Sequence, residues 1–378
     1  MPWQEVSIMS LRREFVMLAA GEGITVRELC RRFGISAPTA YKWLGRYMSE
    51  GVAGLTDRSR RPQRSPSRTS RETEELVLAV RDGHPAWGGR KIRRWLLDRG
   101  RELVPSASTI TAILRRHDRL DPGVSATRHP WQRFEHPAPN QLWQMDFKGH
   151  FALDHGRCHP LTVLDDHSRF ALGLSACGDE RGETVQQHLT TLFRLYGLPE
   201  RLLLDNGSPW GSDADHPHTP LTVWLLRLGI DVTHGRPYHP QTQGKDERFH
   251  RTLKAEVLQG RSFADLIEAQ RAFDAWRPLY NFERPHEALG MATPGSRYRP
   301  SPRSFPESLP PIEYGSADQV RKVQAGGEIY WHNRALKVGN AFRGYPVALR
   351  PTLTDGVWDV FFCTHQIMTL NLRDYDAP

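Results

Sequence analysis

Cysteines and long apolar runs are both scarce in this sequence. Only four cysteines occur in 378 residues, far apart and without a CxxC pair. This argues against a disulfide framework or a structural zinc site and fits a reducing cytosol. No stretch approaches the roughly 18 nearly uncharged residues of a bilayer span, and the N-terminus lacks the basic-then-apolar layout of a signal peptide. We therefore expect a cytoplasmic protein with no membrane partner.

Positive charge is concentrated at the front of the chain. Lys and Arg number 51 against 43 Asp and Glu, a formal net charge of +8. Residues 1–138 hold 25 of the basic residues and only 15 of the acidic ones. A basic front joined to a nearly neutral body indicates a polyanion-binding module attached to something else. The length suggests roughly two to four domains.

Residues 1–56 are predicted to form a helix-turn-helix domain. Apolar residues recur at helical spacing over 11–20, and a capping box opens a second helix that ends at Gly34. The helix after this glycine has a polar and basic outer face that carries Thr39 and Lys42. This arrangement is typical of a DNA-binding helix-turn-helix, and an ordinary pair of packed helices is the alternative.

Residues 57–71 are predicted to be an extended linker. They hold six arginines, two prolines and one acidic residue, a composition that cannot bury a core. Such an arginine-rich arm can lie in the minor groove of DNA, where the negative potential is strongest. The DNA-contacting candidates of this arm are Arg58, Arg60, Arg61 and Arg64.

A second helix-turn-helix domain is predicted over residues 72–125. Its last helix would expose Thr109 and Arg115 toward DNA. Two such domains joined by a basic linker would read a longer DNA site than either alone. The three helices are expected at 72–81, 90–97 and 106–116.

The period of the pattern changes in the next region, residues 126–296. Apolar and polar residues alternate over 143–148, and two more strand patterns follow before helices and strands begin to alternate. This order predicts an α/β sheet covered by helices. Residues 297–318, rich in Pro, Ser and Arg, read as a linker. Short β-rich runs separated by glycine turns predict a small antiparallel β-barrel over 319–378.

Three carboxylates in the α/β region are candidates for catalysis. Asp146 lies on the first strand, Asp205 ends an apolar strand, and Glu247 opens a helix. Carboxylates that converge from such positions can hold Mg²⁺. Each has a simpler reading, as a turn, cap or first-turn helix residue. Position alone leaves four rivals open: Asp165, Asp166, Asp231 and Asp246.

Local sequence around these acids resembles one family. The motifs, in order, are WQMDFK at 143–148, LTVLDDHSR at 161–169, LDNG at 204–207, RPYHPQTQGKDERFHRTLK at 236–254 and YNFERPHEALG at 280–290. Together they resemble the retroviral-integrase-like DDE transposases of bacterial insertion sequences, most closely the group numbered four-eighty-one. The resemblance extends over nearly the whole chain, and the run 236–254 is its most specific part.

The resemblance implies an RNase H-like catalytic core between the two helix-turn-helix domains and the β-barrel. It also implies that Asp146, Asp205 and Glu247 form an acidic triad holding two Mg²⁺ or Mn²⁺ ions. The choice of Glu247 over Asp246 rests on the resemblance alone. Arg251 and Lys254 follow Glu247 at i+4 and i+7, so they share its helix face and are candidates for binding a DNA phosphate.

Two functions of different classes are consistent with the sequence. The first is a DNA transposase that binds the terminal inverted repeats of its element and catalyses strand cleavage and transfer, acting as a homo-oligomer on double-stranded DNA and needing no nucleotide cofactor. The second is a catalytically silent DNA-binding regulator or decayed copy. The presence of all three acids and their surrounding motifs favours the first.

Overall fold

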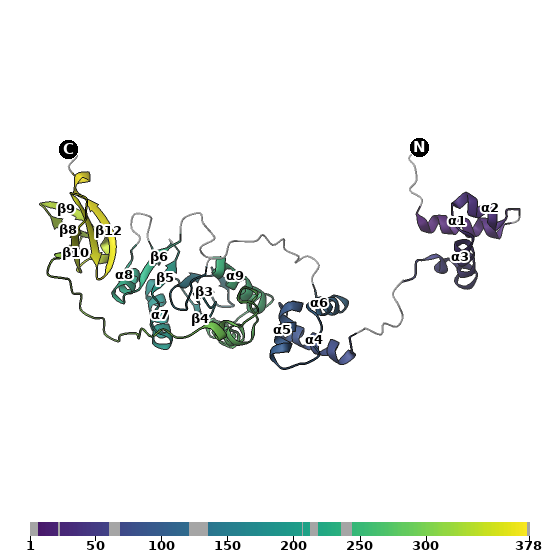
Figure 1. The fold of residues 1–378 in the computed structure, drawn as a ribbon, viewed down its shortest axis with the longest axis horizontal. Helices are drawn as coiled ribbons and strands as arrows, with labels where there is room; N and C mark the ends of the chain where they lie inside the picture. Colours follow the sequence, from purple (N-terminus) through teal and green to yellow (C-terminus); the bar gives the residue numbers. More distant parts are fainter. Residues whose placement is uncertain are drawn as a thin grey trace. The chain divides into compact units, whose positions relative to one another are not determined.

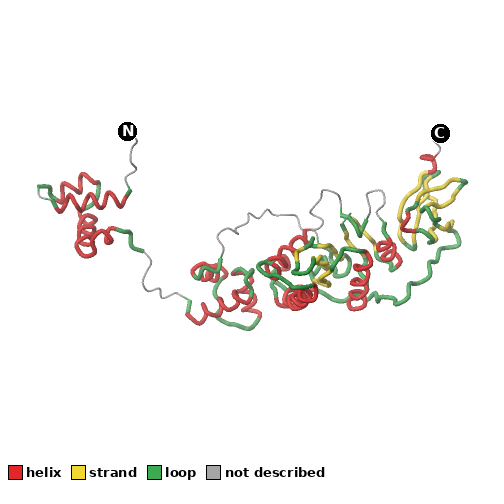
Figure 2. Tube along the Cα trace, turned by 180° about the vertical axis from the view of Figure 1, so that it is seen from behind, coloured by secondary structure: helices red, strands yellow, loops and turns green. Residues whose placement is uncertain are grey.

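The computed structural model divides the chain into two compact units, Met1–Arg68 and Thr69–Pro378, which we describe separately (Figures 1 and 2). It describes residues 7–21, 23–59, 69–120, 135–205, 207–211, 218–235 and 244–375. Three of the arginines predicted to contact DNA, Arg60, Arg61 and Arg64, lie outside these residues. No helix in the described ranges has the length and apolarity needed to cross a bilayer.

The first unit is helical, as predicted. Its helices are α1 (Ile8–Ala20), α2 (Val26–Phe33) and α3 (Ala37–Glu50), followed by a 3-10 turn at Gly51–Leu55. Thr25 caps α2 by accepting a hydrogen bond from the Glu28 amide, and Gly34 ends this helix with φ of 63°. The helices share one core, made of Phe15, Val16, Leu29, Cys30, Ala40, Trp43 and Leu55.

The second unit begins with another three-helix group, formed by α4 (Arg71–Gly83), α5 (Gly89–Asp98) and α6 (Ala107–Arg116). Ser106 caps α6 by accepting a hydrogen bond from the Thr109 amide, so this helix starts where the sequence predicts. Trp87 and Ile110 lie in the shared core of this group. The prediction of a pair of helical domains ahead of the α/β region is therefore confirmed.

A mixed sheet forms the centre of the second unit. Its path is β2-β3-β1-β5-β6, with β4 also paired to β3. Strands β1, β3 and β4 are antiparallel neighbours, whereas β1, β5 and β6 run parallel. The bounds are β1 Trp143–Phe147, β2 Phe151–Ala152, β3 Arg157–Asp165, β4 Ala171–Cys177, β5 Arg201–Leu204 and β6 Asp231–His234.

Helices cover both faces of this sheet, as the sequence predicts. Trp143 and Met145 pack with residues of α7 (Gly182–Tyr196) and α8 (Pro220–Arg227). Leu164 and Leu174 pack on the other side with Phe249 and Leu253 of α9 (Gly244–Leu253) and with α10 (Leu266–Pro278). A π-helical turn, Lys254–Leu258, continues α9, and the short helix α11 (Pro294–Arg297) follows α10. The apolar residues Phe249 and Leu253 thus determine which face of α9 is turned toward the sheet.

The C-terminal region is antiparallel, as predicted, but the predicted closed barrel is not confirmed. Four strands pair in the order β12-β11-β10-β7, while β8 and β9 form a separate hairpin. Within the described residues β7 and β12 are edges that do not pair with each other, so the sheet does not close. The hairpin residues Ile329 and Leu336 fill the core instead of completing a ring. The bounds are β7 Gln319–Lys322, β8 Glu328–Trp331, β9 Arg334–Lys337, β10 Pro346–Pro351, β11 Val357–Phe362 and β12 His365–Asn371.

Candidate catalytic site

Two of the three predicted acids lie side by side at one end of the sheet. Strands β1 and β5 are parallel, with Gln144 opposite Leu203. Asp146 is two residues beyond Gln144, and Asp205 is two residues beyond Leu203, so both stand at the carboxyl ends of adjacent parallel strands. Ligands of open α/β sheets bind at this edge.

Asp146 has the electrostatics expected of a ligand for a cation. Burial raises the pKa of this carboxyl to about 7, and the negative charges of Asp205 and Glu180 act in the same direction. The Asp146 side chain is 25% exposed, while Asp205 is exposed and its carbonyl oxygen accepts a hydrogen bond from the His234 ring at 3.0 Å. Carboxylate oxygens are the ligands that Mg²⁺ prefers, so this pair fits a divalent ion.

Three of the four rival acids have structural partners. Asp165 accepts hydrogen bonds from the Asn140 amide and from Ser168. Asp166 accepts from Gln144 at 2.7 Å and pairs with Lys245. These contacts of Asp165 and Asp166 stabilise the end of β3 and the turn after it, at the end of the sheet opposite to Asp146.

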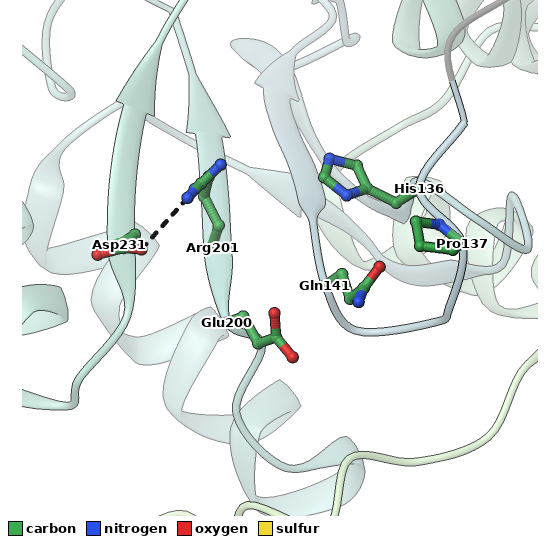
Figure 3. Close-up of a pocket in the computed structure, with 6 residues that line it drawn as sticks. All are labelled: His136, Pro137, Gln141, Glu200, Arg201 and Asp231. Atoms are coloured by element: carbon green, nitrogen blue, oxygen red, sulfur yellow. Dashed lines mark hydrogen bonds and ion pairs between the residues drawn. The ribbon is translucent and has the colours of Figure 1, made fainter.

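Asp231, the third of these rivals, lies at the start of β6 and pairs with Arg201 at 3.4 Å and His365 at 2.7 Å. Figure 3 shows it beside Arg201 in a pocket that Gln141 and Glu200 also line. Because this pocket is at the amino ends of β5 and β6, it is distinct from the Asp146–Asp205 edge.

The fourth rival, Asp246, is buried, whereas its neighbour Glu247 is exposed. Burial, followed by the negative charges of Asp146 and Asp166, raises the pKa of Asp246 well above its usual range. Its Oδ1 atom has no hydrogen-bond partner among the residues the structure describes. In those same residues no group of three acidic, His or Cys side chains is arranged to hold a metal ion. The structure therefore assembles Asp146 with Asp205 and leaves the third acid as a prediction.

Metal binding at this pair is expected to depend on pH. With a pKa of about 7, Asp146 holds a proton at about pH 6 and has lost it at about pH 8. A cation must displace that proton at the lower pH, so about tenfold more Mg²⁺ should be needed there for the same rise in Tm. Thermal melts across a Mg²⁺ titration at both pH values measure this. Asp146→Asn is the control, and equal midpoints for the unaltered protein would contradict the prediction.

Two residues beside Asp146 were not predicted. The His250 ring, on α9, lies with its Nε2 2.8 Å from Thr162 Oγ1 and its Nδ1 4.0 Å from Asp146 Oδ2. Burial and the charge of Lys148 lower the pKa of His250 to about 4. Lys148, two residues beyond Asp146, also has a lowered pKa, through burial and the charge of Lys254. The spacing of Lys148 from Asp146 along the strand is the signal that could have placed it at this edge.

The predicted DNA-contacting residues have different surroundings. Arg251 and Lys254 are exposed, like Glu247, on and just after α9. Arg58 forms an ion pair with Glu50, and Lys42 lies over the Trp43 ring at 4.7 Å. The remaining candidates are Thr39, which is half-buried, Thr109, also half-buried, and Arg115, which is exposed.

Comparison with known families agrees with this architecture. Residues 136–240 and 228–294 match families described as Integrase core domain. Residues 11–63 match a helix-turn-helix domain, and 39–114 match a homeodomain-like domain. Residues 318–377 match the C-terminal domain of IS481 family transposases.

The chain is also similar to individual proteins of bacterial insertion elements. The chain is 29% identical over 157 residues to the insertion element IS407 uncharacterized 31.7 kDa protein of Burkholderia multivorans, covering 42% of this chain and 54% of the relative. It is 28% identical over 156 residues to the insertion element IS476 uncharacterized 39.2 kDa protein of Xanthomonas euvesicatoria, covering 41% and 43%. The chain thus spans about half the length of these relatives.

Among solved structures, the simian T-cell lymphotropic virus intasome in complex with a PP2A regulatory subunit is similar at 14% identity with a TM-score of 0.40. It covers 75% of this chain and 91% of that one. The sequence matches carry the comparison: the chain contains an integrase core domain and a C-terminal domain like that of IS481 family transposases, and its central part is similar to proteins of bacterial insertion elements.

Proposed function

We propose that this protein binds the terminal inverted repeats of its own insertion sequence and catalyses DNA strand cleavage and strand transfer into target DNA. The observation that carries the proposal is the placement of Asp146 and Asp205 at the ends of adjacent parallel strands. This edge belongs to a region that matches the Integrase core domain and follows two helical DNA-binding domains in the chain.

In this proposal Asp146, Asp205 and Glu247 would hold two Mg²⁺ or Mn²⁺ ions. Such ions stabilise the attacking and leaving oxygens during displacement at phosphorus. The exposed cations Arg251 and Lys254 would bind a phosphate of the strand being cut, next to the acids. The positive charge of Lys254 acts on Lys148 and lowers its pKa. Lys148 would therefore add a third positive group for the same DNA strand.

The two helical domains would supply recognition of the element's ends. Thr39, Lys42, Thr109 and Arg115 are the proposed contacts from the helices, and Arg58, Arg60, Arg61 and Arg64 those from the basic arm. Because two element ends must be brought together, we propose a homo-oligomer, at least a dimer, on double-stranded DNA in the bacterial cytoplasm, associated with the nucleoid when bound. No nucleotide cofactor is needed.

The proposal is tested with oligonucleotides copied from the DNA that flanks the gene on each side. The protein, incubated with them in Mg²⁺ or Mn²⁺, should cleave strand ends and join them to a second duplex. Tight binding without cleavage in either metal would overturn the proposal in favour of a silent regulator or decayed copy.

Replacing Arg115 should weaken binding to those flanking oligonucleotides. Arg115 is exposed on α6, and a lost arginine contact to DNA costs about 1–3 kcal/mol, or roughly five- to 150-fold in affinity. Fluorescence anisotropy at several salt concentrations measures Arg115→Ala. Arg271→Ala removes the same charge from an exposed site on α10 and serves as the control. Equal effects of the two variants would remove Arg115 from the recognition surface.

A further inference from the structure

A continuous chain of hydrogen bonds joins helix α9 to the strand that carries Asp146. His250 is three residues after Glu247 on α9, and its side chain is 14% exposed. Its Nε2 lies 2.8 Å from Thr162 Oγ1. Thr162, opposite Asp146 in the β1–β3 register, donates that hydroxyl to the carbonyl oxygen of Asp146 at 3.0 Å. The chain therefore ends on the residue that bears the carboxylate.

The direction of these bonds determines which ring nitrogen carries hydrogen. A threonine hydroxyl has a single hydrogen, and here it is donated to the Asp146 carbonyl. The hydroxyl oxygen must then accept from His250, so Nε2 carries a hydrogen whether the ring is neutral or charged. Nδ1 is left facing Asp146 Oδ2 at 4.0 Å, beyond direct hydrogen-bond distance.

Packing alone does not require this chain. Phe249 and Leu253 already hold α9 against the sheet through an apolar core. Thr162 is fully buried, and a valine has nearly its shape without the hydroxyl. A satisfied polar chain within an apolar contact specifies one arrangement among several that apolar packing would allow.

We propose that His250 and Thr162 are positioning residues, which set the place of Asp146 relative to the helix that carries Glu247. This inference rests on the proposed function, because the position matters only if the acids hold a shared ion. Groups that orient metal-binding side chains typically change metal affinity by 10- to 100-fold when they are replaced. Neither residue is assigned a contact with substrate.

The full-length protein tests this through its thermal stabilisation by Mg²⁺. Thr162→Val keeps the shape and removes the hydroxyl, whereas Thr162→Ser keeps the hydroxyl. We expect Thr162→Val and His250→Ala each to raise the Mg²⁺ concentration of half-maximal stabilisation by about 10- to 100-fold. Thr162→Ser should stay within about twofold of the unaltered protein. The double variant should be little worse than either single one, because both act through one chain.

A second measurement needs no metal. The ¹⁵N chemical shifts of the His250 ring should show hydrogen on Nε2 in the unaltered protein and in Thr162→Ser. Hydrogen on Nδ1 alone would overturn the inference. So would an unchanged Mg²⁺ midpoint in a folded Thr162→Val, and in that case the proposed function stands. If the unaltered protein gains no stability from Mg²⁺ or Mn²⁺, the proposed function fails and this role fails with it.

Discussion

Asp205→Asn is expected to abolish strand cleavage and joining while leaving binding to the element ends nearly unchanged. Asparagine keeps the shape of the side chain but removes the negative charge that a divalent ion requires. A metal supplies several kcal/mol of transition-state stabilisation, so its loss at one ligand should lower the rate about a thousandfold or more. Asp205 is exposed, so the fold should tolerate the change.

The control for this experiment is Asp355→Asn. Asp355 is a fully exposed aspartate in the turn before β11, paired with Arg373 at 3.7 Å. The same chemical change there should leave cleavage, joining and binding within about twofold, as for most surface substitutions. Cleavage that survives in Asp205→Asn would remove this residue from the catalytic site. A loss of end binding in that variant would instead point to an effect on the fold.

Glu247→Gln and Asp246→Asn are expected to separate the two candidates for the third acid. Glu247→Gln should lower strand cleavage about a thousandfold, for the reason given for Asp205. Asp246→Asn should cost no more than about tenfold. Burial raises the pKa of the Asp246 carboxyl and disfavours its charged form, and an asparagine amide is close to a neutral carboxyl in size and polarity. The same oligonucleotide assay measures both.

If Asp246→Asn had the larger effect, the proposed third metal ligand would be Asp246 and not Glu247. If Asp246→Asn abolished cleavage and Glu247→Gln did not, the buried carboxyl would have to become exposed when DNA and metal bind. Chemical denaturation of both variants in the metal-free protein is the accompanying control. Because the Asp246 carboxyl has an oxygen without a partner among the described residues, the asparagine should not lower the free energy of unfolding by more than about 1 kcal/mol.

Local signals in the sequence predicted much of the fold. The capping box that begins at Thr25 and the glycine at position 34 each mark a helix boundary found in the structure. Alternation over 143–148 predicted β1, since strands with two distinct faces show a period of two. Closure into a barrel is not confirmed, and local signals could not decide it: turns specify hairpins, whereas closure depends on β7 pairing with β12, which are distant in the chain.

The candidate site was predictable only where local sequence signals determine it. Asp146 and Asp205 could be placed at strand ends from local pattern, and the parallel register joins them. The burial of Asp246 has a signal in the sequence, because this residue precedes Phe249 by three positions and Leu253 by seven, which is the spacing of the apolar stripe of α9. The contact of His250 with Thr162 has no local signal in the sequence, because it joins residues that are 88 positions apart.

The register between β1 and β5 has a consequence for how copies of such a gene lose activity. Loss of a single codon inside β5 would shift the strand by one residue and turn its side chains to the opposite face. The Asp205 side chain would then no longer lie next to Asp146, although the codons of all the acidic residues remained intact. Short in-frame deletions in this strand should therefore inactivate a copy as fully as a lost carboxylate. A search of decayed copies for intact motifs alone would count such copies as functional.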